Sequence, residues 1–451
     1  MVSSGDNFAG NSGQLMKITS VNAWQIYDSR GIPTVEAEVT LEDGSRGRGL
    51  SPSGASTGQF EALELRDGDP RRFRGKSVFK AIANIRNEIA AALVGSDGLH
   101  QELLDAKLIE LDGTPNKSRL GANAILPVSM AAANAAAAAS HVPLHAYLGK
   151  GRGTLLPIPE IQILGGGAHA NWRTDVQDFL LIAVGAKTFE EVMEITHNVY
   201  HAAGDILRRR EKYFGVADEG GFWPDFDRNE DALELMVEAI EAAGYTPGKD
   251  AAIALDIAAS DLYDKSKGSY SFRLEGKEFT SGEFCSLMVD WCNRFSIVSI
   301  EDPMADTDWD GWSAIAHQLA NRIQLVGDDL FTTNATRIRT GIERQTANSV
   351  LIKLNQIGTV TETIEAIRLT QSAGWQPIVS ARSGETEDAF ISHLAVATNA
   401  GQLKVGSFSR SERMVKWNEV LRIARDLGES ARFIGFQPFK ATTEAKDTLA
   451  L

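Results

Sequence analysis

Two short stretches, IVSIE at 297–301 and QLVGD at 324–328, decide the fold, because each is an apolar run that ends in an acid. The run VLIK at 350–353 follows at a similar interval and ends in a lysine. Each interval is about 25 residues and carries a helical pattern, which is the length of one strand plus one helix. Repeated units of this kind close into a barrel, so this part of the sequence predicts parallel βα units.

The same pattern extends outward from these stretches. Further runs lie at Ile253–Asp256, Pro377–Arg382 and Gln402–Lys404. Nearer the N-terminus the sequence alternates between apolar and polar residues from Ile18 to Leu41, and helical patterns follow at 79–93, 101–111 and 123–148. Strands followed by helices are typical of an α+β domain. We expect a disordered extension at 1–15, an α+β domain at 16–150, a βα barrel at 151–440 and a tail at 441–451.

Composition excludes several classes of protein. The 451 residues include 45 basic and 60 acidic side chains, a formal charge of −15, which argues against binding to nucleic acid or an anionic membrane. The Ala-rich run at 131–139 predicts a buried helix, and no run has the composition of a membrane span. Cys285 and Cys292 on one helix would lie roughly 10 Å apart, too far for a disulfide. We therefore expect a cytoplasmic protein with a small-molecule substrate.

Three acids end three successive predicted strands, namely Asp256, Glu301 and Asp328. The carboxyl ends of barrel strands carry the chemistry of this architecture, so these side chains are expected to converge. Three carboxylates cannot all stay ionised without compensation, and oxygen ligands favour Mg²⁺. A helix cap is the alternative for any single acid, but three in register favour a metal site.

Basic residues follow the neighbouring strands. Lys353 and Lys404 each end a run, where a lysine pairs with a ligand's charge, acts as a base, or forms a structural ion pair. Arg382 and Ser383 stand before a predicted helix, and a guanidinium with a hydroxyl at a helix start favours an anion site over a surface turn.

Two further candidates lie on glycine-rich turns. Glu219 belongs to an Asp-Glu-Gly-Gly turn at 218–221 and is a candidate proton donor. His169 follows three glycines at 165–167, although a lone histidine is more often structural. The small-residue loop at 53–58 is either a lid or a linker.

Taken together, these motifs closely resemble the enolase family over residues 16 to 435. The resemblance is carried by the stretches Asp28–Gly31, Ser53–Gly58, Glu61–Gly68, Asp218–Phe222, Ser299–Pro303, Gly327–Leu330, Lys353–Gly358, Ser383–Asp388 and Arg410–Arg413. It implies an α/β fold in which an N-terminal α+β domain packs on a modified βα (TIM-like) barrel. It also implies two Mg²⁺ ions per site and a homodimer or higher homo-oligomer.

The resemblance further implies a role for each candidate residue. Asp256, Glu301 and Asp328 would hold the first Mg²⁺, and Ser56 would join the second. As in other enolase-superfamily sites, a lysine, here Lys353, would be the base. In the enolase reaction, which removes water from 2-phosphoglycerate, Glu219 and Asp178 would act where the hydroxyl group leaves carbon 3. The substrate would be bound by His169, Arg382, Ser383 and Lys404.

Several positions depart from the usual enolase pattern. Ala381 stands where a histidine is typical, and Asp178 replaces a glutamate that is one methylene, roughly 1.5 Å, longer. Ile32, Trp223 and the loop at 164–173 also differ. The metal and phosphate residues remain, so the altered group is mainly the one that handles the leaving hydroxyl.

We therefore expect a diverged enolase paralogue, such as carboxyphosphonoenolpyruvate synthase of phosphonate biosynthesis. Trp172 and Arg173 would then either shape a pocket for a second partner or belong to a surface loop. One alternative is a genuine enolase that converts 2-phosphoglycerate to phosphoenolpyruvate. The other is a non-catalytic enolase-fold binding protein, against which the intact acid set argues.

Overall fold

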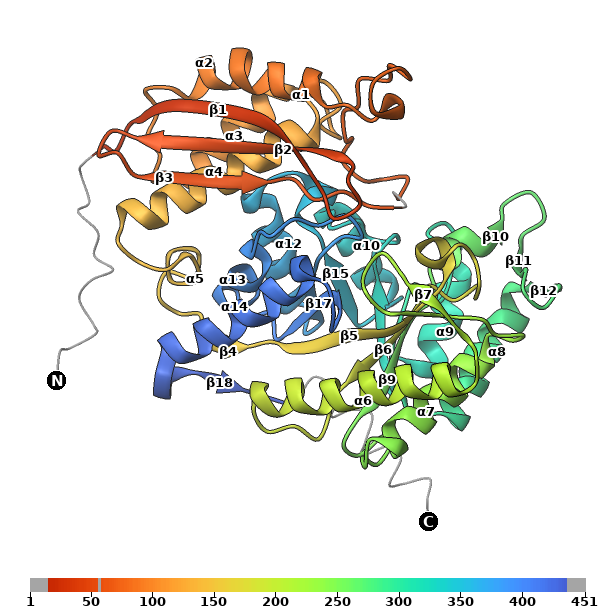
Figure 1. Cartoon of the computed structure of the whole chain (residues 1–451). Helices are drawn as coiled ribbons and strands as arrows, with labels where there is room; N and C mark the ends of the chain where they lie inside the picture. Colours follow the sequence, from red (N-terminus) through yellow and green to blue (C-terminus); the bar gives the residue numbers. More distant parts are fainter. Residues whose placement is uncertain (1–14, 56–57, 436–451) are drawn as a thin grey trace.

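The computed structural model describes residues 15–55 and 58–435 of the chain. A small sheet with helices, formed by the N-terminal part, lies against a larger barrel (Figure 1). Residues 1–14 of the expected extension, the expected tail at 441–451 and Ser56 lie outside the described residues. The predicted fold class, an α+β domain followed by a modified βα barrel, is confirmed.

The N-terminal sheet has three antiparallel strands, β1 (Ile18–Tyr27), β2 (Pro33–Leu41) and β3 (Arg46–Leu50). Alternate residues of β2 are buried, including Val35, Ala37 and Val39, as expected for a sheet with one covered face. That face is covered by the long helix α4 (Ala122–Ala139), and α1 (Phe79–Asn84) and α3 (Gln101–Asp112) pack beside it.

Helix α4 approaches β3 very closely. A Cβ atom added to Gly47 would lie 2.2 Å from Ala131 O, and one added to Gly49 would lie 2.2 Å from Pro127 O. Glycines on the strand and alanines on the helix therefore allow backbone-to-backbone packing. α4 is long and apolar enough to cross a membrane by length and composition, but 83% of this stretch is buried in the protein. It is a core helix, as the alanine-rich run predicted.

One predicted helix is divided in two. The pattern at 123–148 suggested a continuous helix, but α4 ends at Ala139 and α5 (Leu144–Leu148) begins five residues later. His141 adopts a left-handed conformation with φ 54°, and Pro143 directly precedes α5. Proline disfavours a helical residue before it and cannot donate to the preceding turn, so the helix stops here.

The barrel is a closed ring of eight strands within the described residues, because β17 pairs with both β16 and β5. In spatial order the strands are β5 (Ile158–Gly165), β6 (Asp178–Ile182), β9 (Ala252–Asp256), β13 (Ile297–Glu301), β14 (Gln324–Gly327), β15 (Ser349–Ile352), β16 (Gln376–Ser380) and β17 (Gln402–Ser407). From β9 to β17 and back to β5 every pairing is parallel.

Strand β6 breaks the parallel pattern, because it runs antiparallel to both β5 and β9. The prediction of βα units covered the runs from Ile253 onward, where the strands are parallel, and β6 lies before those runs. The segment between β5 and β6 holds only a short 3-10 helix, η3 (Gly167–Ala170). A parallel partner requires a crossover connection, usually an α-helix, so this short connection yields an antiparallel strand.

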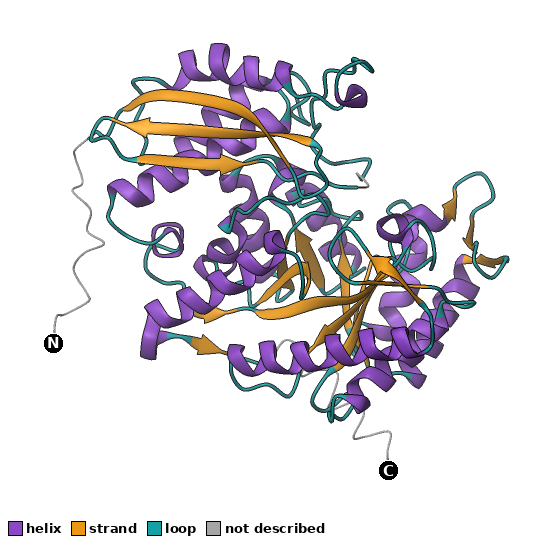
Figure 2. Cartoon of the chain, viewed as in Figure 1, coloured by secondary structure: helices purple, strands orange, loops and turns teal. Residues whose placement is uncertain are grey.

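Helices surround the barrel on its outside (Figure 2). The longer ones are α6 (Phe189–Arg209), α7 (Glu230–Ala242), α8 (Ser281–Arg294), α9 (Trp309–Leu319), α10 (Ala335–Arg344), α12 (Val360–Ser372), α13 (Phe390–Ala397) and α14 (Ser411–Leu427). Thr280 and Glu283 form a capping box at the start of α8, which satisfies backbone donors that the helix leaves unpaired.

The N-terminal part contacts the barrel at the carboxyl ends of its strands. Ser53 and Gly384 exchange two backbone hydrogen bonds of 2.9 and 2.8 Å, which join the segment after β3 to the loop after β16. The Ala62 N–H donates to Gln356 O at 2.8 Å, beside the strand-end residue Lys353. These contacts place Ser53 and Ala62 at the barrel end where the predicted site lies.

Candidate active site

The three predicted metal-ligating acids lie side by side at the carboxyl ends of adjacent strands. Asp256 ends β9, Glu301 ends β13, and Asp328 directly follows β14. The parallel register pairs Glu301 with Asp256 on one side and with Val326 of β14 on the other. All three side chains are buried, so their charges require compensation from within the protein.

Two lysines supply that compensation, Lys404 on β17 across the barrel and Lys353 directly after β15, which pairs with β14. Lys404 Nζ lies 2.9 Å from Asp256 Oδ2 and 2.7 Å from Glu301 Oε2. Lys353 Nζ lies 2.5 Å from Asp328 Oδ2. Burial by itself would lower the pKa of Lys404, but the adjacent Asp256 and Glu301 carboxylates raise it well above its usual value. Burial likewise acts to lower the pKa of Lys353, but the Asp328 carboxylate outweighs it and raises that pKa.

Among Asp256, Glu301 and Asp328, one carboxylate oxygen has no hydrogen-bond partner in the part of the chain that the structure describes. Burial, followed by the negative charge of Asp256, raises the pKa of Glu301 well above its usual value. Glu301 Oε1 is buried and has no hydrogen-bond partner among the described residues. An orphaned carboxylate oxygen within an all-oxygen donor set fits a hard divalent cation such as Mg²⁺.

A second acid follows two of these ligands, Asp302 after Glu301 and Asp329 after Asp328. One carboxylate oxygen each of Asp302, Asp328 and Asp329 lies within 4.8 Å of the others. Asp302 accepts the backbone N–H groups of Asp328 at 2.9 Å and Asp329 at 2.8 Å. Burial, and then the charge of Asp328, raises the pKa of Asp329 to about 8. Asp302 and Asp329 were not predicted as site residues from the sequence. The signal for them was the pairing of acids at 301–302 and 328–329.

The predicted anion-binding residues form another wall of the same cavity. Arg382 and Ser383 are buried there, and Arg413 fixes their backbone by donating to Arg382 O at 2.6 Å and to Ser383 O at 2.5 Å. The Arg382 guanidinium contacts Glu61, with Nη1 2.9 Å from Oε2 and Nη2 3.1 Å from Oε1. It also donates to Asn355 Oδ1 at 2.8 Å. Glu61 belongs to one of the stretches that resemble enolases, but nothing in the sequence pairs it with Arg382, which lies 321 residues away.

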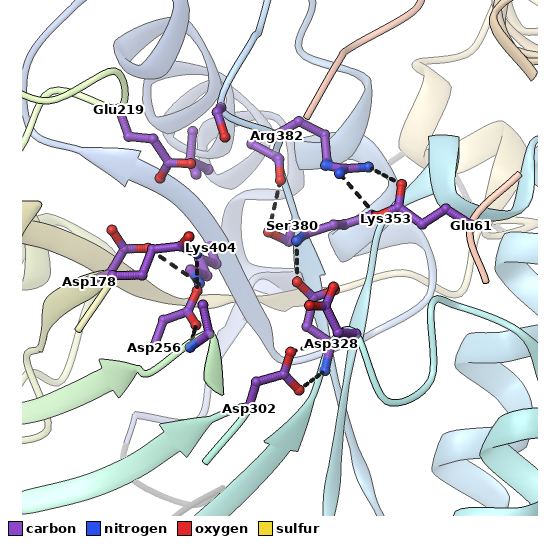
Figure 3. A pocket seen from close by; sticks show the side chains of 16 residues that line it. Glu61, Asp178, Glu219, Asp256, Asp302, Asp328, Lys353, Ser380, Arg382 and Lys404 are labelled. Carbon is purple, nitrogen blue, oxygen red and sulfur yellow. Dashed lines mark hydrogen bonds and ion pairs between the residues drawn. The ribbon is translucent and has the colours of Figure 1, made fainter. Parts of the chain in front are cut away.

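Glu219 and Asp178 lie on the opposite side of the cavity from Lys353 (Figure 3). Asp178 Oδ2 is 3.8 Å from Lys404 Nζ, so Asp178 also belongs to the surroundings of that lysine. The neighbouring Gln177 donates from Nε2 to Asp256 Oδ2 at 3.0 Å. The cavity is also lined by small apolar side chains, among them Ala381, which stands where a histidine is typical of enolases.

Two expected site residues cannot be placed in the same way. Ser56 lies outside the described residues, and His169 belongs to η3 with only its backbone described. The neighbouring loop residues Trp172 and Arg173 pack locally. Arg173 Nη1 lies 2.7 Å from Asp225 Oδ1, and the Arg273 guanidinium carbon lies 4.3 Å from the Trp172 ring centroid. Neither Trp172 nor Arg173 lines the cavity among the described residues.

The arrangement suits removal of a proton from an anionic substrate. Lysines and an arginine offer positive charge to an anionic ligand, and carboxyl groups face the buried Lys353 across the cavity. Such groups flank a reacting carbon in general acid–base catalysis.

Comparison with known proteins supports the same conclusion. The family model described as "Enolase, N-terminal domain" matches residues 18–148, and "Enolase, C-terminal TIM barrel domain" matches residues 153–442. Enolase 1 of Desulfitobacterium hafniense (strain Y51) is 56% identical over 418 residues, which cover 92% of this chain and 95% of that protein. These matches do not support the expected carboxyphosphonoenolpyruvate synthase and fit the alternative, a genuine enolase, better. The chain therefore belongs to the enolase family and is a lyase of the phosphopyruvate hydratase-like type.

Proposed function

We propose that this enzyme is a genuine enolase, which removes water from 2-phosphoglycerate to give phosphoenolpyruvate. The observation that carries the proposal is the opposition of Lys353 to Glu219 and Asp178 across one cavity. A β-elimination from a carboxylic acid requires a base at carbon 2 and an acid at carbon 3, on different sides of the substrate.

We propose that Asp256, Glu301 and Asp328 hold the first of two Mg²⁺ ions, with Ser56 assigned to the second by family resemblance. The buried, unpartnered Glu301 Oε1 supports this assignment. Bound Mg²⁺ would neutralise the charge that develops on the substrate carboxylate and would weaken the hold of Asp328 on the Lys353 proton.

Lys353 is the proposed base. Its amine must be neutral to accept the carbon 2 proton. Burial and the cationic groups of Arg382 and Lys404 act against the protonated form, but the Asp328 carboxylate outweighs them and raises the pKa. The C2–H bond breaks, the proton moves to Nζ, and the electron pair stays on the substrate as an enolate. Lys404 would bind the substrate carboxylate, and Arg382 with Ser383 would bind the phosphate.

The second half of the reaction takes place on the other side of the cavity. The enolate electron pair forms the C2=C3 double bond while the C3–O bond breaks. Glu219 donates a proton to the departing hydroxyl, which leaves as water, and Asp178 contributes negative charge beside it. His169 stays a proposed substrate-binding residue on the basis of the family resemblance.

Formation of phosphoenolpyruvate from 2-phosphoglycerate with Mg²⁺, followed by absorbance, tests the proposal. Exchange of the carbon 2 proton in D₂O, followed by NMR, tests the Lys353 half separately. We expect both activities, and we expect Lys353→Met to lose both. A wild-type protein that binds phosphoenolpyruvate in a Mg²⁺-dependent way but forms none from 2-phosphoglycerate would contradict the proposal. The same assays separate an enzyme from a non-catalytic binding protein.

We also propose a cytoplasmic homodimer. Tyr27 on β1 and Phe73 are 54% and 41% exposed, and their ring centroids lie 6.1 Å apart. An exposed aromatic pair on the surface is a candidate contact between two copies. Light scattering coupled to size-exclusion chromatography tests the assembly, and a monomer at micromolar concentration would contradict it.

A further inference from the structure

Gln162 is a buried amide that joins two parts of the proposed active site. It lies on β5 with no solvent exposure. Its Nε2 donates to Asp178 Oδ1, and its Oε1 accepts the Gly221 N–H at 2.7 Å. Because the Gly221 N–H can only donate, it must face the amide oxygen, and the amide nitrogen then faces the Asp178 carboxyl group.

The position of Gln162 follows from the sheet register. Gln162 pairs with Leu180 across the antiparallel β5–β6 ladder, and Asp178 lies two residues from Leu180 on the same face. Diagonal neighbours of this kind are within reach of a long side chain. The antiparallel turn of β6, which the sequence did not predict, is therefore what brings the two side chains together.

Two glycines leave a narrow slot for the amide. A Cβ atom on Gly221 would lie 2.5 Å from Gln162 Oε1. One on Gly165 would lie 3.3 Å from Gln162 Nε2 and 2.5 Å from Ala217 Cβ. The slot has no room for larger residues at either position, so the side chain is held between the strand and the turn.

The two partners of Gln162 serve the same half of the proposed reaction. Asp178 Oδ2 lies 3.8 Å from Lys404 Nζ. Gly221 ends the turn that carries Glu219, whose carbonyl oxygen in turn accepts the Ser407 N–H at 2.9 Å. Lys353 belongs to the segment after β15 and makes its ion pair with Asp328, away from this slot.

We propose that Gln162 is a positioning residue that holds the Asp178 carboxyl group and the Glu219 turn as one unit on the side where water leaves. The inference rests on the proposed enolase function and adds a residue to it. Asp178 has a short side chain, so the orientation of its carboxyl group depends on the partner that it can reach. Loss of Gln162 should slow C3–O cleavage, while removal of the carbon 2 proton by Lys353 should continue.

Gln162→Met tests this, because methionine keeps most of the volume and removes both hydrogen bonds. We expect phosphoenolpyruvate formation to fall roughly 10²-fold, as for a misplaced catalytic group. We expect carbon 2 exchange in D₂O and the KM for 2-phosphoglycerate to stay within about threefold of wild type. An equal fall in both rates, or no fall in elimination, would overturn the inference.

Gln324→Met is the matched control, since Gln324 is also a buried barrel glutamine and bonds Gln402 and Ser299. This variant should be less stable than wild type, but the ratio of its carbon 2 exchange rate to its rate of phosphoenolpyruvate formation should stay at the wild-type value. Gln162→Asn, which keeps the amide but shortens its reach, should show the same separation if Gln162→Met does not fold. The double variant Gln162→Glu/Asp178→Asn exchanges amide and carboxyl group. It should recover thermal stability without recovering elimination, and recovery of both would count against the inference.

The wild-type activities distinguish a failure of the proposed enolase function from a failure of the proposed role of Gln162. A wild type with neither exchange nor elimination would overturn the proposed function and this inference with it. A wild type with both activities, beside a Gln162→Met variant that keeps elimination, would overturn only the role of Gln162.

Discussion

Lys353 Nζ lies 2.5 Å from Asp328 Oδ2, so the proposed base contacts a proposed metal ligand directly. This contact raises the pKa of Lys353 against the opposing effect of its burial. The lysine is therefore held in its protonated form, which cannot accept a proton, as long as Asp328 keeps its full negative charge.

The first prediction concerns magnesium and pH. A cation on Asp328 neutralises the charge that raises the pKa of Lys353, so that pKa should fall and the neutral base should appear at lower pH. The pH profile of carbon 2 exchange should therefore have a lower midpoint at high Mg²⁺ concentration than at low Mg²⁺ concentration. A midpoint that does not move with Mg²⁺ would mean that metal binding does not affect the pKa of Lys353.

A second prediction concerns metal removal. Asp256, Glu301 and Asp328 are buried with one carboxylate oxygen unpartnered, so a bound cation should stabilise the folded protein. At about 100 times the Kd, the gain is about 2.7 kcal/mol. Thermal unfolding should shift upward with Mg²⁺ and back with EDTA. Asp256→Asn should remove the shift, whereas the distant surface variant Asp205→Asn should keep it.

The third prediction concerns the anion site. The Glu61 carboxylate accepts two hydrogen bonds of 2.9 and 3.1 Å from the Arg382 guanidinium. Glu61 therefore competes with phosphate for those N–H donors. Glu61→Gln should lower the Kd for inorganic phosphate severalfold in calorimetry at fixed ionic strength. Glu64→Gln is the matched control, because Glu64 pairs with Arg66 instead. Weaker phosphate binding in Glu61→Gln would mean that Glu61 orients Arg382 rather than competing for it.

The fourth prediction concerns stability against pH. Burial raises the pKa of Glu160 to about 7, while Gln402 Nε2 donates to its Oε1 at 3.0 Å. The folded state thus keeps a proton that the unfolded chain releases near pH 4.3, and stability contributed by this group falls as pH rises from about 4 to 7. Glu160→Gln should match wild type near pH 4 and exceed it at pH 8 by on the order of 3 kcal/mol. A difference in unfolding free energy that does not change with pH would contradict this.

The last prediction concerns the N-terminal core. Gly49→Ala would place a Cβ atom 2.2 Å from the backbone oxygen of Pro127, which cannot move as a side chain can. Chemical denaturation should show a loss of about 3 kcal/mol or more, at the upper end of overpacking effects. Gly282→Ala, which meets nothing within 4 Å on α8, should be neutral or slightly stabilising.

Much of the site followed from the sequence, because strand ends are local features. An apolar run that ends in Glu301 or Asp328 must leave the core at that residue, whatever its neighbours are. The spacing of the runs then gave the barrel, and parallel strands brought their ends to one edge. Asp256, Glu301, Asp328, Lys353, Arg382, Ser383 and Lys404 could all be assigned to one barrel end in this way.

The sequence could not decide which groups contact one another across the barrel. Lys404 reaches Asp256 and Glu301, and Glu61 reaches Arg382, only because the ring closes and the N-terminal segment lies over it. These pairs are far apart along the chain, and a shift of one residue in register would turn a strand's side chains to the other face. The contact between Gln162 and Asp178 depends instead on the antiparallel direction of β6, which follows its short connection to β5. The sequence by itself thus determined which chemical groups meet at the barrel end, and the tertiary structure decided which of them pair, because pairing depends on register and closure.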